Sequence, residues 1–321
     1  MLSKDEFFEK YNITEEMFEA AQISWDALER IHDKFACERD NFIRLGKEFQ
    51  EEFFKDIVEE SQLCSSAYRT RERCDMKLHS IYWRVKDPEH LVEKIIRKRT
   101  SNYKWYGRIN EDNYQQIVTD LVGFRGMLVF KEDWGHIHER IMNKLIDDPE
   151  WYRDHIDFDR NQDIKDYCLA EPPTAHIREG DDKSLYLYYL GEANIVSKQN
   201  YRSVHYVVGY HGIYIEFQIR TLFEDAFAEI DHRLRYPLQA SDEKLTRYAG
   251  IINHLAGAVD ELGSFYLGLA SPQDQEALTE KKGEIHGMVH HSQAFSRKEK
   301  EQSIYIPPQT IEQCLLNKLK Q

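Results

Sequence analysis

Hydrophobic and polar positions divide the chain into two helix-like ends and a strand-rich middle. In the first part, apolar residues recur at helical spacing with charged residues between them, as at Ile31, Phe35, Phe42, Phe49 and Phe53. We therefore expect two or three helices before residue 75.

The middle of the chain is rich in Val, Ile, Tyr and Phe, which favour strands. We predict strands within 121–130, 184–197 and 203–220, separated by helical patterns at 91–99 and 134–146. Gly209 and Gly212 lie on either side of Tyr210 and His211, which indicates a hairpin there. Helical patterns return at 222–236 and continue from Leu245 to Leu262. Strands mixed with helices indicate an α/β or α+β domain.

The run YIEFQIR alternates between two faces. Ile215, Phe217 and Ile219 share one face, and Glu216, Gln218 and Arg220 share the other. One interpretation is a half-buried strand with a solvated polar face. The other is a carboxylate, an amide and a guanidinium held on one rigid surface for catalysis.

Charge adds a second feature. The chain has 43 basic and 57 acidic residues and a formal net charge of −14, which argues against a protein that coats nucleic acid. Residues 69–108 are an exception, with 12 Lys and Arg against five acids. This segment, called here the basic island, is either a solvated helix face or a sink for polyphosphate. Arg84 and Lys86 precede Pro88, which predicts a helix start, and Lys94 lies within that helix.

Asp120 precedes the predicted strand 121–130, where a hard oxygen ligand can bind Mg²⁺. The five cysteines are scattered and form no CxxC pair, which argues against a disulfide framework or a zinc site. No apolar run approaches membrane-spanning length, and the N-terminus lacks an apolar signal core. These features predict a cytoplasmic protein with no membrane partner.

Four blocks stand in order along the chain: RVKDPEHLVEK (84–94), TDLVGFR (119–125), NYRSVHYVV (200–208) and EFQIRTLFEDAFAEIDH (216–232). Together they resemble the synthetase domain of RelA/SpoT proteins, most of all the small alarmone synthetases. The resemblance implies an α+β fold, with a mixed-sheet, nucleotidyltransferase-like synthetase core flanked by N-terminal and C-terminal helices. It implies a helical segment at 1–74, a synthetase domain at 75–265 with an insertion at about 131–199, and a helical or polar tail at 266–321. The hydrolase domain of long family members is not expected, because only about 75 residues precede the core.

The resemblance also implies a reaction. The family transfers pyrophosphate from Mg²⁺-bound ATP to the 3′-hydroxyl of GDP or GTP, and AMP leaves. Carried onto this chain, the catalytic residues are Glu216, Asp120, Arg84, Lys86 and His232, and the metal ligands are Asp120 and Glu216. ATP-binding positions are Arg84, Lys86, His90, Lys94 and Arg125, with the two arginines on either side of adenine. Acceptor-binding positions are Lys198, Tyr201, Gln218, Arg220 and Asp225, with Tyr201 stacking on the acceptor base.

Three positions depart from the family pattern. His90 stands where small synthetases have Ser, Asn200 replaces Gly, and Asp225 stands where Asn is common. Because these changes concern the acceptor and the entrance of the site, two alternatives stay open. One is a toxin-type enzyme acting on the 3′-CCA end of tRNA or on adenosine nucleotides, and the other is an inactive nucleotide-binding module. A homo-oligomer or an antitoxin-like regulator is the further partner that the family suggests.

Overall fold

A computed structural model describes residues 1–58, 78–155, 164–198, 200–235 and 242–270. Contacts group the chain into two units, Met1–Ser264 and Phe265–Gln321. The first unit contains the sheet and the candidate site.

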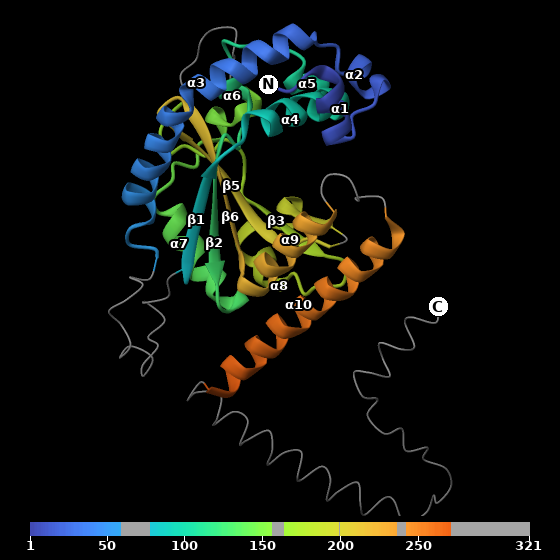
Figure 1. The fold of residues 1–321 in the computed structure, drawn as a ribbon. Coiled ribbons are helices and arrows are strands. Elements are labelled where there is room, and N and C mark those ends of the chain that lie inside the picture. The colour runs from blue at the N-terminus through green and yellow to red at the C-terminus, as the bar shows by residue number, and fades with distance from the viewer. Residues whose placement is uncertain (59–77, 156–163, 199, 236–241, 271–321) are drawn as a thin grey trace, which may run out of the picture. The chain divides into compact units, whose positions relative to one another are not determined.

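A six-stranded mixed sheet forms the centre of this unit, in the order β1-β2-β6-β5-β3-β4 (Figure 1). The strands are β1 (Ser80–Val85), β2 (Val122–Leu128), β3 (Thr174–Arg178), β4 (Ile195–Lys198), β5 (Ser203–Tyr210) and β6 (Ile213–Thr221). β2 pairs with β6 in parallel, as β3 does with β4, and the other pairs are antiparallel. The sheet confirms the predicted α+β class.

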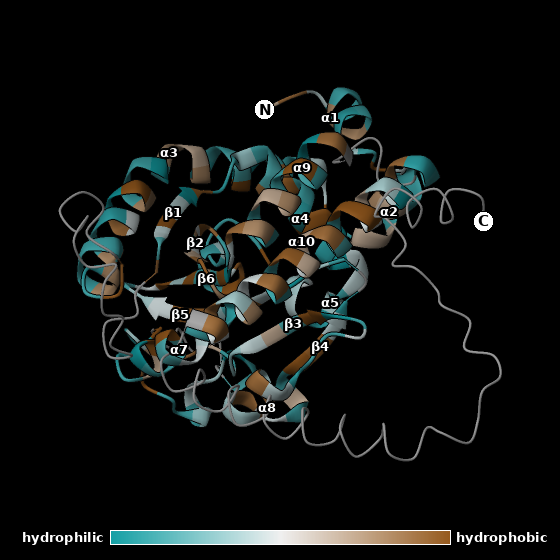
Figure 2. Ribbon diagram, turned by 90° about the horizontal axis from the view of Figure 1, so that it is seen from below, coloured by the Kyte–Doolittle hydropathy of each residue, from teal (hydrophilic) through white to brown (hydrophobic). Residues whose placement is uncertain are grey.

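Helices precede, interrupt and follow the strands. They are α1 (Lys4–Tyr11), α2 (Glu15–Ala21), α3 (Trp25–Phe49), α4 (Pro88–Ser101), α5 (Tyr103–Tyr106), α6 (Tyr114–Ile117), α7 (Trp134–Met142), α8 (Ser184–Leu190), α9 (Leu222–Arg235) and α10 (Glu243–Ala270). The side chains of Ser3, Thr14 and Ser24 cap the first three helices by accepting from backbone N–H groups, as short polar residues do at helix starts. Figure 2 shows hydrophilic and hydrophobic residues intermixed along α3, as its amphipathic pattern predicts. None of the described helices has the length and apolar composition to cross a membrane.

Aromatic packing holds α3 on one face of the sheet. Phe49 and the π-helical turn that follows it (Gln50–Phe54) place rings against Phe124 of β2 and Phe217 of β6, with ring centroids 5.4–6.4 Å apart. Burying such rings is favourable by several kcal/mol in total, at about 25 cal/mol per Å² of apolar area. The opposite, polar face of the same strands is therefore the one left for a site.

The predicted strand at 184–197 is wrong over its first half. Residues 184–190 form α8, and only Ile195–Lys198 form a strand. Tyr186 is buried against Trp134 of α7, with ring centroids 5.0 Å apart. Packing on α7 therefore outweighs the strand preference of a Tyr-rich run.

The predicted hairpin is confirmed, with its turn one residue later than expected. β5 ends at Tyr210 and β6 begins at Ile213, so His211 and Gly212 form the two-residue loop. Both have positive φ, at 47° and 80°. This is the pattern of a type I′ turn, which matches the twist of the strands that it joins.

Buried charges attach α10 to the ends of β3 and β5. Arg178 pairs with Glu224 of α9 at 3.1 Å, and Arg202 pairs with Asp181 at 2.9 Å and with Asp260 of α10 at 3.2 Å. The Arg178 guanidinium lies directly on Gly257 of α10, where a Cβ would be 2.1 Å from a guanidinium nitrogen. Only a glycine permits this approach.

Gly46 of α3 offers a test of the packing between α3 and β1. A Cβ at this position would lie 2.5 Å from the Trp83 ring. We expect Gly46→Ala to lower the free energy of unfolding by about 1–3 kcal/mol, because the ring must shift within a packed interface. Gly250→Ala, in α10 with open space around its Cβ, is the matched control. It should be neutral or stabilising by up to about 1 kcal/mol. Urea denaturation of both variants measures this, and equal effects would contradict the packing argument.

Candidate active site

Strand register brings polar residues from four strands onto one face of the sheet. Glu216 lies beside Gly123 of β2, which in turn lies beside Arg84 of β1. Gln218 lies beside Arg125 on one side and His205 of β5 on the other. The alternation predicted for YIEFQIR therefore recurs in the neighbouring strands and places their functional groups together.

All of these residues except His205 line a cavity of about 290 Å³. Six of the predicted site residues take part: Arg84, Lys86, Asp120, Arg125, Glu216 and Gln218. Gly123 also lines the cavity, and a Cβ there would meet nothing within 4 Å. Because it has no side chain, the space between Arg84 and Glu216 stays open.

Asp120 is the electrostatic centre of this cavity. Lys86, directly after β1, lies 2.9 Å from one carboxylate oxygen, and Lys94 of α4 lies 2.7 Å from the other. Burial raises the pKa of Asp120, but the two ammonium groups outweigh burial and lower that pKa to about 2. The Asp120 carboxylate is therefore ionised at neutral pH.

Glu216 lines the same cavity as Asp120 and contacts His205 of β5. His205 Nδ1 lies 3.0 Å from Glu216 Oε1. Burial raises the pKa of Glu216, but the hydrogen bond and charge of His205 outweigh it, so the pKa lies below its ordinary value. Glu216 is thus a partly buried carboxylate available to a bound hydroxyl.

A second group of predicted residues adjoins Glu216. Tyr201 contacts His205 at 2.7 Å, and the Arg220 guanidinium carbon lies 5.6 Å from the centre of the Tyr201 ring. Arg220 also hydrogen-bonds the Gln218 side chain and lies 3.7 Å from Asp225. Asp225 is in turn 3.6 Å from Arg125. The predicted ATP and acceptor residues therefore meet at Glu216, Gln218 and Asp225.

Seven predicted residues do not line the cavity: Lys94, Tyr201, Arg220 and Asp225 contact residues that adjoin it, and the other three are His90, Lys198 and His232. His90 packs edge-on against Tyr11, Lys198 is exposed at the end of β4, and His232 is exposed on α9. The N-terminus of α4 is capped by Asp87, which accepts from the N–H groups of Glu89 and His90. The roles assigned to His90, Lys198 and His232 stay predictions.

The basic island separates into functional and structural residues, and its part at 69–77 lies outside the described residues. Arg84, Lys86 and Lys94 surround Asp120 or its cavity. Arg99, in contrast, is buried and donates to carbonyl oxygens at the ends of α2 and α5. Arg99 is therefore not part of a solvated helix face, because its hydrogen bonds join the ends of α2 and α5.

Sequence reasoning missed His205 and His176. His205 is two residues before Val207, which pairs with Glu216, and His176 of β3 lies on the same face with its ring 4.5 Å from that of His205. The signal for His205 was present in the block NYRSVHYVV. The alternation of Ser203, His205 and Val207 on one strand face could have identified it.

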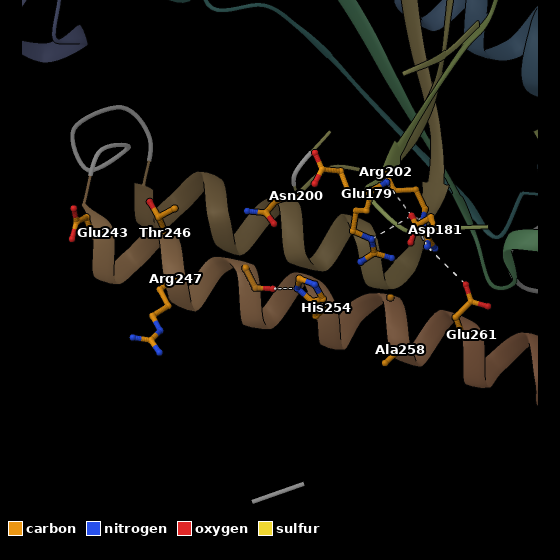
Figure 3. Close-up of a pocket in the computed structure, with 13 residues that line it drawn as sticks. Glu179, Asp181, Asn200, Arg202, Glu243, Thr246, Arg247, His254, Ala258 and Glu261 are labelled. Atoms are coloured by element: carbon orange, nitrogen blue, oxygen red, sulfur yellow. Dashed lines mark hydrogen bonds and ion pairs between the residues drawn. The ribbon is translucent and has the colours of Figure 1, made fainter. Parts of the chain in front are cut away.

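A larger cavity lies elsewhere, between α10, the end of β3 and the start of β5 (Figure 3). It measures about 810 Å³, and Arg178 and Arg202 line it together with acids such as Glu179, Asp181 and Glu261. Both arginines are already paired with carboxylates. Because charges of both signs alternate there, this cavity does not have the character of an anion site.

The donor set around Asp120 and Glu216 suits a hard cation. Mg²⁺ binds through one or two carboxylates and takes its other oxygens from water and substrate phosphates. Among the described residues, no three His, Cys, Asp or Glu side chains converge as a complete metal cage. Two carboxylates beside a phosphate-sized cavity therefore fit Mg²⁺ bound together with a nucleotide, and Lys86 and Lys94 would share Asp120 with it.

The sheet and the candidate site fall largely within a region that matches a known protein family. Residues 83–241 match the family described as "Region found in RelA / SpoT proteins", so this part of the chain belongs to that family. No curated protein matches the chain significantly.

Solved structures with similar folds include three bacterial proteins. Small alarmone synthetase 1 from Bacillus subtilis, bound to its product pppGpp, has 20% identity and a TM-score of 0.45 over 73% of this chain and 98% of that one. Small alarmone synthetase 2 from the same organism has 18% identity and a TM-score of 0.35 over 75% and 95%. A GTP pyrophosphokinase family protein from Streptococcus pneumoniae has 20% identity and a TM-score of 0.36 over 79% and 97%. Family membership rests on the matched region 83–241.

The charge of Asp120 predicts a pH dependence of stability. Its pKa is about 2 in the folded chain against about 3.9 unfolded, so its stabilisation is present above pH 4 and is lost as pH falls towards 2. We expect Asp120→Asn to lower the free energy of unfolding by about 2 kcal/mol or more near neutral pH. The difference in this free energy between the variant and the wild-type protein should shrink below pH 4. Urea denaturation from pH 7 to pH 3 measures it. Asp112→Asn, at an exposed ion pair, is the control and should show no such difference. A difference independent of pH would contradict the assignment.

Proposed function

We propose that the chain is a pyrophosphokinase that transfers the β,γ-pyrophosphate of ATP to the 3′-hydroxyl of GDP or GTP. The observation that carries the proposal is that Glu216 and Asp120 line one cavity together with Arg84, Lys86 and Arg125. Family membership of residues 83–241 supports it. The B. subtilis relative solved with pppGpp is named as a synthetase of that kind of product.

The chemistry requires charge neutralisation and alignment more than covalent help. Lys86 and Lys94 supply positive charge at Asp120, beside the position for phosphate. Arg84 and Arg125 extend from adjacent strands, two residues apart in register, and can hold the adenine between their guanidinium planes. A base stacked on Tyr201 would bring its ribose towards Glu216.

In the transfer step, the 3′-oxygen of the acceptor forms a bond to the β-phosphorus of ATP. The bond from that phosphorus to the bridging oxygen of the α-phosphate breaks, and AMP leaves with the electron pair. Glu216 accepts the proton of the attacking hydroxyl. Mg²⁺, when held by Asp120 and Glu216 with the nucleotide, would neutralise the charge on the phosphates.

The acceptor distinguishes this proposal from its main alternative. Asp225 lies between Arg125 and Arg220, and Asn200 precedes Tyr201, so two of the three family departures adjoin the predicted acceptor residues. A toxin-type enzyme would use the same donor residues with tRNA 3′-CCA or an adenosine nucleotide. An inactive module would bind nucleotide without turnover.

Incubation with Mg²⁺, ATP labelled at the β-phosphate and single acceptors tests the proposal. We expect label on GDP or GTP, and Glu216→Gln should reduce the rate at least about 100-fold because the proton acceptor is lost. Glu179→Gln, in the larger cavity, is a control that should leave the rate unchanged. Label on tRNA or AMP alone would establish the toxin-type alternative. ATP binding without transfer to any acceptor would establish the inactive module.

A further inference from the structure

Tyr82 of β1 and Glu229 of α9 line the smaller cavity, and the family resemblance gives neither of them a role. Tyr82 is 59% exposed, and the Glu229 side chain is 46% exposed. Both therefore present their side chains beside the cavity instead of packing into the core. They differ in character, since one is an aromatic ring and the other a carboxylate, so each can contact a different part of a ligand.

Strand register places Tyr82 at the end of the cavity that lies away from Asp120. Tyr82 and Arg125 are direct partners in the pairing of β1 with β2. Lys86, which contacts Asp120, comes four residues after Tyr82, a distance of about 13 Å at roughly 3.3 Å per residue of extended chain. A nucleoside triphosphate spans a similar length from its base to its last phosphates. Phosphates held beside Asp120 would therefore place the base beside Tyr82 and Arg125.

The two carboxylate oxygens of Glu229 have different surroundings. Oε1 accepts a hydrogen bond from Arg233, one turn later on α9, at 2.8 Å. Oε2 lies 3.9 Å from Arg125 Nη1, which is near enough for charge attraction but too far for a hydrogen bond. The hydrogen bond from Arg233 lowers the pKa of Glu229, so its carboxylate is ionised at neutral pH. Oε2 is therefore an acceptor that an N–H group of a ligand can use.

Arg125 and Glu229 together present a donor and an acceptor side by side. A guanidinium only donates hydrogen bonds, and an ionised carboxylate only accepts them. Adenine has the matching pair on one edge, where its 6-amino donor lies beside the N7 acceptor, whereas guanine has two acceptors on that edge. A purine without the 6-amino group would leave the carboxylate oxygen without a donor when the base covers it.

We propose that Tyr82 and Glu229 complete the site for the base of the pyrophosphate donor. Glu229 Oε2 accepts a hydrogen bond from the 6-amino group of adenine, and the Tyr82 ring packs against the base at the outer end of the cavity. Glu229 then selects adenine, while Tyr82 adds affinity for any purine. This inference deepens the proposed function and rests on it, because it takes ATP as the donor.

Two nucleotides and three substitutions separate these roles. ATP and purine riboside 5′-triphosphate differ only in the 6-amino group, and their binding in Mg²⁺ without an acceptor requires no transfer. The variants are Glu229→Ala, Tyr82→Ala and Tyr82→Phe. Glu48→Ala is the matched control. Glu48 pairs with Arg44 one helical turn away on α3, as Glu229 does with an arginine on α9.

Calorimetric titration of each protein with each nucleotide is the first measurement. The unchanged protein should bind ATP about 10-fold or more tightly than purine riboside 5′-triphosphate, as expected for a hydrogen bond to a charged group. In Glu229→Ala this preference should fall below about twofold, because the acceptor is removed. Tyr82→Ala should weaken the binding of both nucleotides about fivefold or more and keep the preference. Tyr82→Phe and Glu48→Ala should match the unchanged protein.

Two results would overturn the proposal. An equal loss of affinity for both nucleotides in Glu229→Ala would mean that Glu229 acts only through Arg125 and does not contact the amino group. Unchanged affinities in Tyr82→Ala would mean that the ring does not touch the base.

Pyrophosphate transfer by the same proteins is the second measurement. Tyr82→Ala should raise the KM for ATP about fivefold or more and change kcat less than about threefold, because the ring contacts the base equally in the ground and transition states. Transfer to GDP or GTP, together with an undiminished preference for ATP in Glu229→Ala, would overturn this inference and leave the proposed function in place. A preference that is lost in Glu229→Ala, in a protein that transfers pyrophosphate to no acceptor, would instead overturn the proposed function and leave the base site in place.

Discussion

The carboxylate of Asp120 lies between Lys86 and Lys94, and so it joins the end of β1, the first turns of α4 and the start of β2. A buried carboxylate with two ammonium partners is costly to separate, because each charge left behind would remain desolvated. These three elements therefore keep a fixed spacing around the cavity. That spacing determines where a phosphate chain can lie relative to Glu216 on the next strand.

The sheet provides the remaining residues of the site because one of its faces is apolar and the other is polar. Rings from α3 and the π-helical turn cover the face that carries Phe124 and Phe217, which leaves the face of Glu216 and Gln218 for polar groups. The tight turn at His211 and Gly212 sets the register of β5 against β6. A slip of one residue would turn His205 away from Glu216 and into the core.

Alternation in YIEFQIR predicted the two faces of β6, and the family blocks predicted most of the cavity lining. Contacts between residues distant in sequence could not be predicted from the local pattern. The pattern predicts Arg99 to be a solvated helix residue, but its guanidinium donates hydrogen bonds to carbonyl oxygens at the ends of two helices. The tyrosines of segment 184–190 favour a strand, so local pattern predicts one there. The segment is a helix, in which Tyr186 packs against Trp134. Sequence also could not show that Asp87 caps α4, because Asp at that position suits both a cap and an exposed loop.

Gly257 fixes the orientation of α10 about its own helix axis. The Arg178 guanidinium occupies the space that a side chain at position 257 would need. Only one rotation of α10 about its axis therefore lets it pack against the ends of the strands. One residue added or removed between the start of α10 and this glycine would turn the preceding segment by about 100° relative to it. A change of length in the first half of α10 would therefore alter which of its faces meets the ends of the strands, while Gly257 stayed against Arg178.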